Sequence, residues 1–221
     1  MENIKENKSY YNVNSFYLLF FKRFFDIILS ISLITLFLPF FILIPICIKL
    51  SSKGNIFFKQ ERVTQNNKKF YMYKFRSMIE NAELDTGPIF ADNNDKRCTK
   101  IGLILRKLSL DEIPQFFNVL KGDMSLVGPR PERPYYIDIF SKDIPNYNNR
   151  HSVKTGITGL SQIKGLRGKT SIKERTKYDL DYINKISLFY DLNIIFNTII
   201  IILVEFIKFI KTILLSQKKI L

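Results

Sequence analysis

The chain has 221 residues, which fits one domain of ordinary size or two small ones. Hydrophobic residues make up 46% and charged residues 24%, which excludes a mainly disordered chain. The net charge of +14 favours an anionic partner: a nucleic acid, a membrane surface or a phosphorylated substrate. Two cysteines and one histidine exclude a disulfide framework and a His/Cys zinc cluster. We expect both cysteines to be reduced and His151 to lie on the surface.

Residues 1–19 are polar and read as a flexible N-terminal tail. Residues 27–48 then form an apolar run without a charge, long enough to cross a bilayer. No small-residue cleavage site follows this run, so it does not resemble a cleavable signal peptide. A buried core helix is the alternative, but a chain with so little soluble core rarely buries a run of this length.

Two features of this run favour a helix that enters and leaves on one side of the membrane. Pro39 lacks the N–H that would bond to the Thr35 carbonyl, and the Thr35 hydroxyl lies near that break; Pro45 is a second proline within the run. Cations flank both ends of the run, and the positive-inside tendency therefore favours the cytoplasmic side for each end. We therefore predict a re-entrant membrane helix over residues 20–50, with a kinked spanning helix as the alternative. The flanking cations are Lys22, Arg23, Lys49, Lys53, Lys59 and Arg62.

The middle of the chain predicts a small α+β domain. Residues 56–63 and 69–78 look like two strands, and residues 65–67 form the turn of a hairpin. Residues 80–97 carry several carboxylates with Gly and Pro, which is typical of a long loop with solvated acidic side chains.

Ser109 and Glu112 have the spacing of a capping box, followed by an apolar helical face that ends at Gly122. Asp111 and Glu112 are thereby predicted at a helix N-terminus, where free amides and the helix dipole keep carboxylates ionised and attract phosphate. Taken alone, such a pair is usually only a cap. The predicted apolar face comprises Ile113, Phe116, Phe117 and Leu120.

The second half of the chain has three further features. Residues 128–131 form a rigid Gly-Pro-Arg-Pro turn with one guanidinium, and residues 155–159 read as a Gly-rich loop. Residues 170–185 predict a charged helix. Residues 192–221 predict an amphipathic helix in the membrane interface, because a spanning helix would have to bury Glu205 and Lys208.

Short motifs follow one another in order across residues 20–198. They are Phe21-Lys22-Arg23 with Asp26, Phe58-Lys59-Gln60-Glu61-Arg62, Tyr73-Lys74-Phe75-Arg76-Ser77-Met78, Leu105-Arg106, Ser109-Leu110-Asp111-Glu112, Asn118-Val119-Leu120-Lys121-Gly122-Asp123-Met124-Ser125, Val127-Gly128-Pro129-Arg130-Pro131 and Gly156-Ile157-Thr158-Gly159. This ordered set resembles the bacterial sugar transferase family, the monotopic polyprenyl-phosphate phosphoglycosyl transferases. The family often has Ser-Pro at its helix bend, where this chain has Leu38-Pro39.

The resemblance implies a two-step reaction that begins glycan assembly for exopolysaccharide, capsule, O-antigen or glycoprotein. A UDP-sugar would give its sugar-1-phosphate to an enzyme carboxylate and release UMP, and polyprenyl (undecaprenyl) phosphate would then take the phosphosugar. In the family the Asp of the Asp-Glu pair is the nucleophile and the Glu supports it at a magnesium site. This implies Asp111 and Glu112 as catalytic residues and metal ligands, with Mg²⁺ as cofactor. The substrate-binding residues implied are Lys74, Arg76, Arg106, Pro129, Arg130, Pro131 and Arg167.

The resemblance also implies a mostly helical domain, residues 51–191, at the cytoplasmic face of the inner membrane. The expected partners are the UDP-sugar, the polyprenyl phosphate and the membrane, without nucleic acid. A homo-oligomer and downstream glycosyltransferases are further partners that it leaves open. The rival class is a non-enzymatic, basic membrane-surface adaptor for anionic lipid. That class explains the net charge but not the Asp-Glu pair or the Gly-Pro-Arg-Pro turn.

Overall fold

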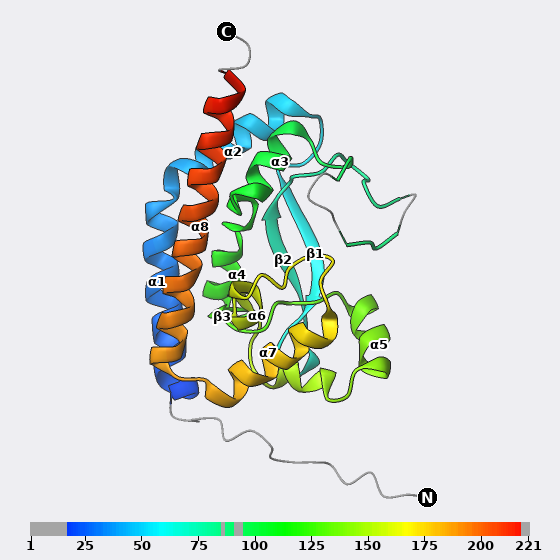
Figure 1. Ribbon diagram of the computed structural model, residues 1–221, viewed down its shortest axis with the longest axis vertical. Helices are drawn as coiled ribbons and strands as arrows, with labels where there is room; N and C mark the ends of the chain where they lie inside the picture. The colour runs from blue at the N-terminus through cyan, green and yellow to red at the C-terminus, as the bar shows by residue number, and fades with distance from the viewer. Residues whose placement is uncertain (1–16, 85–86, 91–94, 218–221) are drawn as a thin grey trace, which may run out of the picture.

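The computed structural model describes residues 17–84, 87–90 and 95–217 (Figure 1). Helices predominate, together with an antiparallel hairpin of β1 (Phe57–Val63) and β2 (Lys69–Phe75), which confirms a mostly helical fold with a short hairpin. The other elements are η1 (Tyr17–Phe21), α1 (Lys22–Leu36), α2 (Leu38–Ser51), η2 (Gln65–Asn67), α3 (Lys100–Lys107), η3 (Leu110–Glu112), α4 (Gln115–Lys121), β3 (Ser125–Val127), α5 (Pro134–Asp143), η4 (Tyr147–Ser152), β4 (Gly156–Thr158), α6 (Leu160–Ile163), α7 (Ile172–Lys185) and α8 (Leu188–Gln217).

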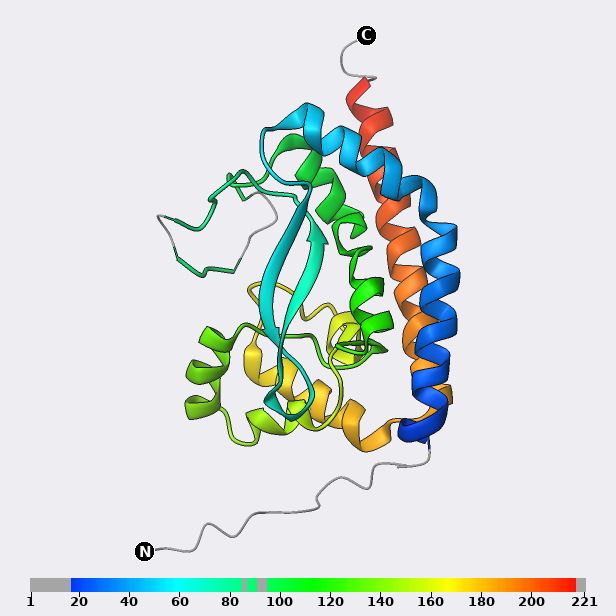
Figure 2. The same ribbon diagram turned by 180° about the vertical axis from the view of Figure 1, so that it is seen from behind.

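The long apolar helices gather on one flank of the molecule. α1 and α8 run side by side there, and α2 crosses over the end of the body, while the hairpin and shorter helices form the opposite side (Figures 1 and 2). Most of the predicted tail, residues 1–16, lies outside the described residues. The end of the predicted tail is helical, because η1 begins at Tyr17. The Tyr17 hydroxyl donates to Asp191 Oδ2 at 2.7 Å.

The apolar run of residues 27–48 is broken, as its prolines predict. α1 and α2 meet at an angle of 59°, with the break at Phe37 and Pro39 in the first turn of α2. Pro45 lies inside α2 without ending it. The Thr35 hydroxyl does not serve the backbone at the break, because it donates to the Ile31 carbonyl one turn earlier, at 3.0 Å.

The hairpin forms where it was predicted, with Gln65–Asn67 as its turn. Asn66 and Asn67 have φ of 57° and 58°, a left-handed conformation that Asn tolerates better than most residues. β2 ends at Phe75, and Met78 instead pairs with Cys98 in an isolated bridge. Side chains alternate along a strand, so Lys74 shares the face of the buried Phe70 and Met72 and reaches into the body of the molecule.

His151 is not the surface residue that we expected. Only 4% of it is exposed, and its Nδ1 lies 2.6 Å from Asn67 Oδ1 in the hairpin turn. Burial, assisted by the nearby Arg150 charge, lowers the pKa of His151 to about 4. The residue was misjudged because a polar neighbourhood in sequence does not reveal a contact with a turn more than 80 residues away.

α8 begins at Leu188, four residues before the predicted interfacial helix, and its described part ends at Gln217. Over Leu188–Thr212 it is long and apolar enough to cross a membrane, and among the described residues it is the one unbroken helix of which this holds. Glu205 and Lys208 pair on its surface at 2.8 Å. The interfacial placement of this helix therefore stays a prediction.

Candidate active site

The two adjacent carboxylates lie on η3, a single turn between α3 and α4. Ser109 precedes this turn in a left-handed conformation, with φ of 56°, and its side chain caps no amide. The predicted capping box is therefore wrong, because the left-handed residue turns the chain before the helix starts. α4 itself begins at Gln115, after Pro114, and ends at Gly122 as predicted. Asp111 and Glu112 thus precede the helix rather than form its first turn.

Glu112 is held by two cations from separate parts of the chain. Its Oε1 accepts hydrogen bonds from Lys74 Nζ at 2.7 Å and from an Arg130 terminal nitrogen at 2.6 Å. Burial would raise the pKa of Glu112, but Arg130 and Lys74 outweigh it and hold the pKa well below its usual range. Glu112 is therefore an ionised carboxylate in a fixed position.

Asp111 is more buried than Glu112 and much less constrained. Asp111 is 6% exposed. Among the described residues, the nearest cation within ion-pair reach is Lys74, whose Nζ lies 4.0 Å from Asp111 Oδ2. Burial raises the pKa of Asp111, with the Glu112 charge adding to it and Lys74 opposing it. The result is a carboxylate beside a charged neighbour, with its oxygens less engaged than those of Glu112.

Three predicted arginines surround the same cavity, which has a volume of about 1730 Å³. Arg130 binds Glu112 and also donates to Gln162 Oε1 at 3.3 Å. Arg106 comes from the last turn of α3, with one terminal nitrogen 3.4 Å from Cys98 Sγ. Arg167 lies on the cavity wall near Arg130. Together with Lys74, these arginines surround the carboxylates of Asp111 and Glu112 with positive charge, as phosphate binding requires.

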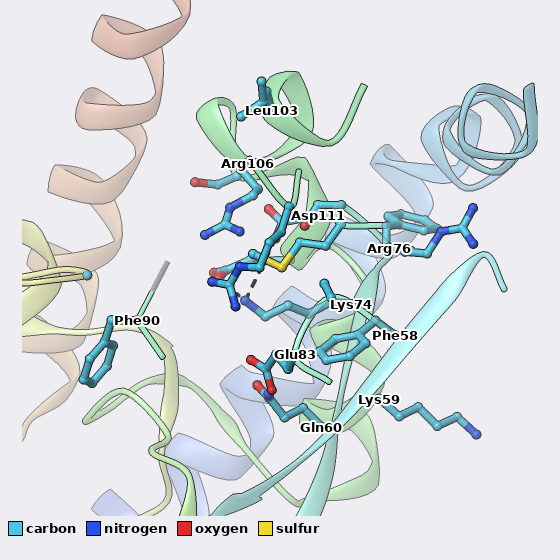
Figure 3. Close-up of a pocket in the computed structure, with 18 of the residues that line it drawn as sticks. Phe58, Lys59, Gln60, Lys74, Arg76, Glu83, Phe90, Leu103, Arg106 and Asp111 are labelled. Atoms are coloured by element: carbon cyan, nitrogen blue, oxygen red, sulfur yellow. Dashed lines mark hydrogen bonds and ion pairs between the residues drawn. The ribbon is translucent and has the colours of Figure 1, made fainter. Parts of the chain in front are cut away.

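Arg76 is placed differently from the other predicted binding residues. Its guanidinium donates to the carbonyl and hydroxyl oxygens of Ser52, each at 2.9 Å, and to the carbonyl of Lys53. In Figure 3 it points away from Asp111. Its observed contacts therefore fix the end of α2, and its role in substrate binding stays a prediction.

The Gly-Pro-Arg-Pro turn is fixed by hydrogen bonds to its carbonyls as well as by its prolines. The Pro129 carbonyl accepts from the Gly156 amide at 2.9 Å, and the Pro131 carbonyl accepts from the Arg62 guanidinium at 3.1 Å. The predicted Gly-rich loop is therefore partly a strand, β4, which pairs in parallel with β3. A Cβ on Gly156 would lie 2.1 Å from the Gly128 nitrogen, so this glycine serves backbone packing.

A sequence model of the family described as bacterial sugar transferase matches residues 17–205. The chain belongs to this family. Among its curated relatives, the UDP-N-acetylgalactosamine-undecaprenyl-phosphate N-acetylgalactosaminephosphotransferase of Aeromonas hydrophila is 44% identical over 191 residues, covering 85% of this chain and 44% of the relative. The UDP-glucose:undecaprenyl-phosphate glucose-1-phosphate transferase of Klebsiella pneumoniae is 46% identical over 183 residues, covering 81% and 39%.

This bacterial sugar transferase thus spans less than half the length of those two relatives. The exopolysaccharide production protein PSS of Rhizobium leguminosarum bv. phaseoli matches along nearly its whole length, with 40% identity over 186 residues, 81% of this chain and 93% of the relative.

A second charged cluster in the cavity of this sugar transferase was not foreseen. Arg133 forms two hydrogen bonds of 2.9 Å with the Glu83 carboxylate, and Glu132 pairs with Arg62 at 3.2 Å. Arg133 directly follows the Gly-Pro-Arg-Pro-Glu stretch, so its closeness to Arg130 in sequence was the one available signal. The partner of Arg133 comes from residues 80–97 and that of Glu132 from β1, and no local pattern connects these segments to the turn.

Proposed function

We propose that this sugar transferase moves a sugar-1-phosphate from a UDP-sugar to polyprenyl phosphate, through a covalent intermediate on Asp111. The observation that carries the proposal is the unequal treatment of two adjacent buried carboxylates. Lys74 and Arg130 fix Glu112 as an anion, whereas Asp111 keeps its oxygens less engaged beside the same cations. The names of the relatives, which pair a UDP-sugar with undecaprenyl phosphate, support this substrate class.

In the first step, an Asp111 oxygen attacks the phosphorus that carries the sugar. A bond forms between that oxygen and phosphorus, and the bond from phosphorus to the bridging diphosphate oxygen breaks, so UMP leaves with the bridging oxygen. Carboxylates are established nucleophiles for phosphoryl groups. No proton needs to move. The negative charge that the UDP-sugar and the Asp111 carboxylate together lose when the adduct forms leaves with UMP. Arg130, Arg106 and Lys74 are placed to stabilise negative charge on the phosphate oxygens.

In the second step, an oxygen of the polyprenyl phosphate attacks the same phosphorus. The bond from phosphorus to Asp111 breaks, which restores the free carboxylate and yields a polyprenyl diphosphate sugar. The fixed anion of Glu112 has a distinct part in both steps. It holds Lys74 and Arg130 at the site while Asp111 alternates between a free and an esterified state.

The donor set fits Mg²⁺, which takes one or two protein carboxylates together with phosphate and water oxygens. Glu112 Oε2 has a single long contact, 3.5 Å from Arg130. Among the described residues there is no group of three or more His, Cys, Asp or Glu side chains placed for a metal. Asp111 and Glu112 would therefore hold the ion with the donor phosphates, and the ion would neutralise charge on the diphosphate.

We also propose that the bent pair α1 and α2 enters and leaves the membrane on the cytoplasmic side, where nucleotide sugars occur. The 59° bend and the cations at both ends support this placement. Single cysteines at positions 15 and 53, in a background lacking Cys47 and Cys98, test it. Both should resist an impermeant thiol reagent in intact cells and react after lysis. Labelling at position 15 alone in intact cells would indicate a spanning helix.

The direct test of function is to incubate the purified protein with a panel of UDP-sugars and undecaprenyl phosphate and to measure UMP release. One or a few UDP-sugars should give UMP release, and repeated turnover should require undecaprenyl phosphate. Failure of every UDP-sugar, with intact binding to anionic vesicles, would favour the non-enzymatic adaptor instead.

A further inference from the structure

One face of α8 forms a wall of the catalytic cavity. Thr198, Ile201, Ile202 and Glu205 follow the helical spacing of one face, and all four line the same cavity as Asp111. The inner end of this wall is fixed, because the hydroxyls of Thr198 and Thr158 lie 2.7 Å apart. Ile202 remains 43% exposed, so this wall is open to an apolar ligand.

The opposite wall comes from α3. Leu103, Lys107 and Leu108 line the cavity on this side, and Leu103 is 38% exposed. Lys107 Nζ lies 5.3 Å from the centre of the Phe209 ring, which links the end of α3 to α8 beyond the cavity. α3 and α8 therefore enclose a groove with apolar side chains on both sides.

The polarity of this groove changes along its length. Figure 3 shows Leu103 and Arg106 on the same helix, with Arg106 the nearer of the two to Asp111. At that inner end the groove is cationic, while Leu103, Ile201 and Ile202 contribute apolar side chains to its walls. Such a groove suits a ligand with a phosphate head and a long hydrocarbon tail.

We propose that this groove between α3 and α8 binds the prenyl chain of the acceptor, with the acceptor phosphate against Arg106. The assignment rests on the proposed function, which requires a lipid phosphate at Asp111. The donor does not suit the groove, because a UDP-sugar has no apolar portion that Ile201 and Ile202 would desolvate. α8 continues as an exposed apolar helix, so the chain passes from the groove directly into surrounding lipid.

The test compares two isoleucines of the same helix and the same exposure. Ile202 is 43% exposed and lines the cavity, whereas Ile200 is 42% exposed and does not. Ile202→Ser should raise the KM for undecaprenyl phosphate about tenfold, the effect expected of a lost hydrophobic contact, and Ile200→Ser should leave it unchanged. Any general loss of membrane affinity affects both variants alike. Leu103→Ser tests the opposite wall and should act like Ile202→Ser.

The donor half-reaction separates this proposal from the proposed function. Exchange of labelled UMP into the UDP-sugar requires no acceptor, so it should keep its wild-type rate in Ile202→Ser and Leu103→Ser. A short-chain prenyl phosphate, which does not fill the groove, should be used equally by wild type and variants. An unchanged acceptor KM in both groove variants, or an equal rise in Ile200→Ser, would overturn the groove while leaving exchange intact. Absence of exchange in the wild type would instead overturn the covalent mechanism.

Discussion

The ring of Phe37, at the bend between α1 and α2, stacks on the ring of Phe116 in α4, with centroids 6.3 Å apart and planes 5° from parallel. One turn further, Phe41 contacts Phe117 at 5.5 Å and Phe75 at 5.7 Å. The bend therefore rests on the body that carries Asp111, since η3 leads directly into α4. The position of the bent pair α1 and α2 and the position of the carboxylates therefore depend on the same packing surface.

This packing predicts that Pro39 is not required for the bend. Pro39→Ala should leave positions 15 and 53 equally protected from an impermeant thiol reagent in intact cells, because the aromatic contacts persist. Phe116→Ala should lower the free energy of unfolding by about 3 kcal/mol, the usual cost of emptying a buried aromatic site. Exposure of position 15 in Pro39→Ala would show that the proline itself turns the chain.

Arg130→Lys should not behave as a conservative change. Lysine keeps the charge but loses the planar, two-pronged donor that reaches both Glu112 and Gln162. A lost charge-assisted hydrogen bond is worth about 2 kcal/mol, or roughly 30-fold in kcat/KM for the UDP-sugar. The melting temperature should change little. A ratio equal to that of the wild type would reassign Arg130 to a purely structural ion pair.

Glu112→Gln tests the fixed anion and the metal together. The neutral amide no longer balances Lys74 and Arg130, so turnover should fall by at least tenfold while the protein stays folded. Removing divalent ions with EDTA should abolish wild-type turnover, and Mg²⁺ should restore it. Turnover that persists in EDTA would remove the metal from Asp111 and Glu112 without affecting the role of Arg130.

His151 predicts a specific pH dependence of stability. Its pKa is about 4 in the folded protein and about 6.5 when exposed, so stability from this residue is complete above about pH 6.5 and declines as the pH falls toward 4. At pH 5 the loss is about 2 kcal/mol. Chemical denaturation at pH 7.5 and 5 should show a smaller drop for His151→Gln than for the wild type. Equal drops in the two proteins would mean that folding leaves the pKa of His151 unchanged.

The sequence predicted those features that local patterns determine. Two strand-like segments and the Gln-Asn-Asn turn between them located the hairpin, and Pro39 located the broken helix within two residues. It did not predict contacts between distant segments, such as Lys74 with Glu112 or His151 with Asn67. The capping-box prediction at Ser109 was wrong for a different reason. The Ser-x-x-Glu pattern carries no information about the left-handed conformation of Ser109 that the following turn imposes. The cavity wall formed by α8 was missed because, in the sequence, apolar residues that line a cavity cannot be distinguished from apolar residues that face lipid.

In the proposed reaction, Asp111 carries the sugar-phosphate between the two substrates. The most direct measurement is peptide mass spectrometry after the wild-type protein reacts with its UDP-sugar in the absence of acceptor. A phosphosugar adduct should form on Asp111, disappear when undecaprenyl phosphate is added and never form in Asp111→Asn. An adduct on another residue, or UMP release by Asp111→Asn at the wild-type rate, would contradict this role of Asp111.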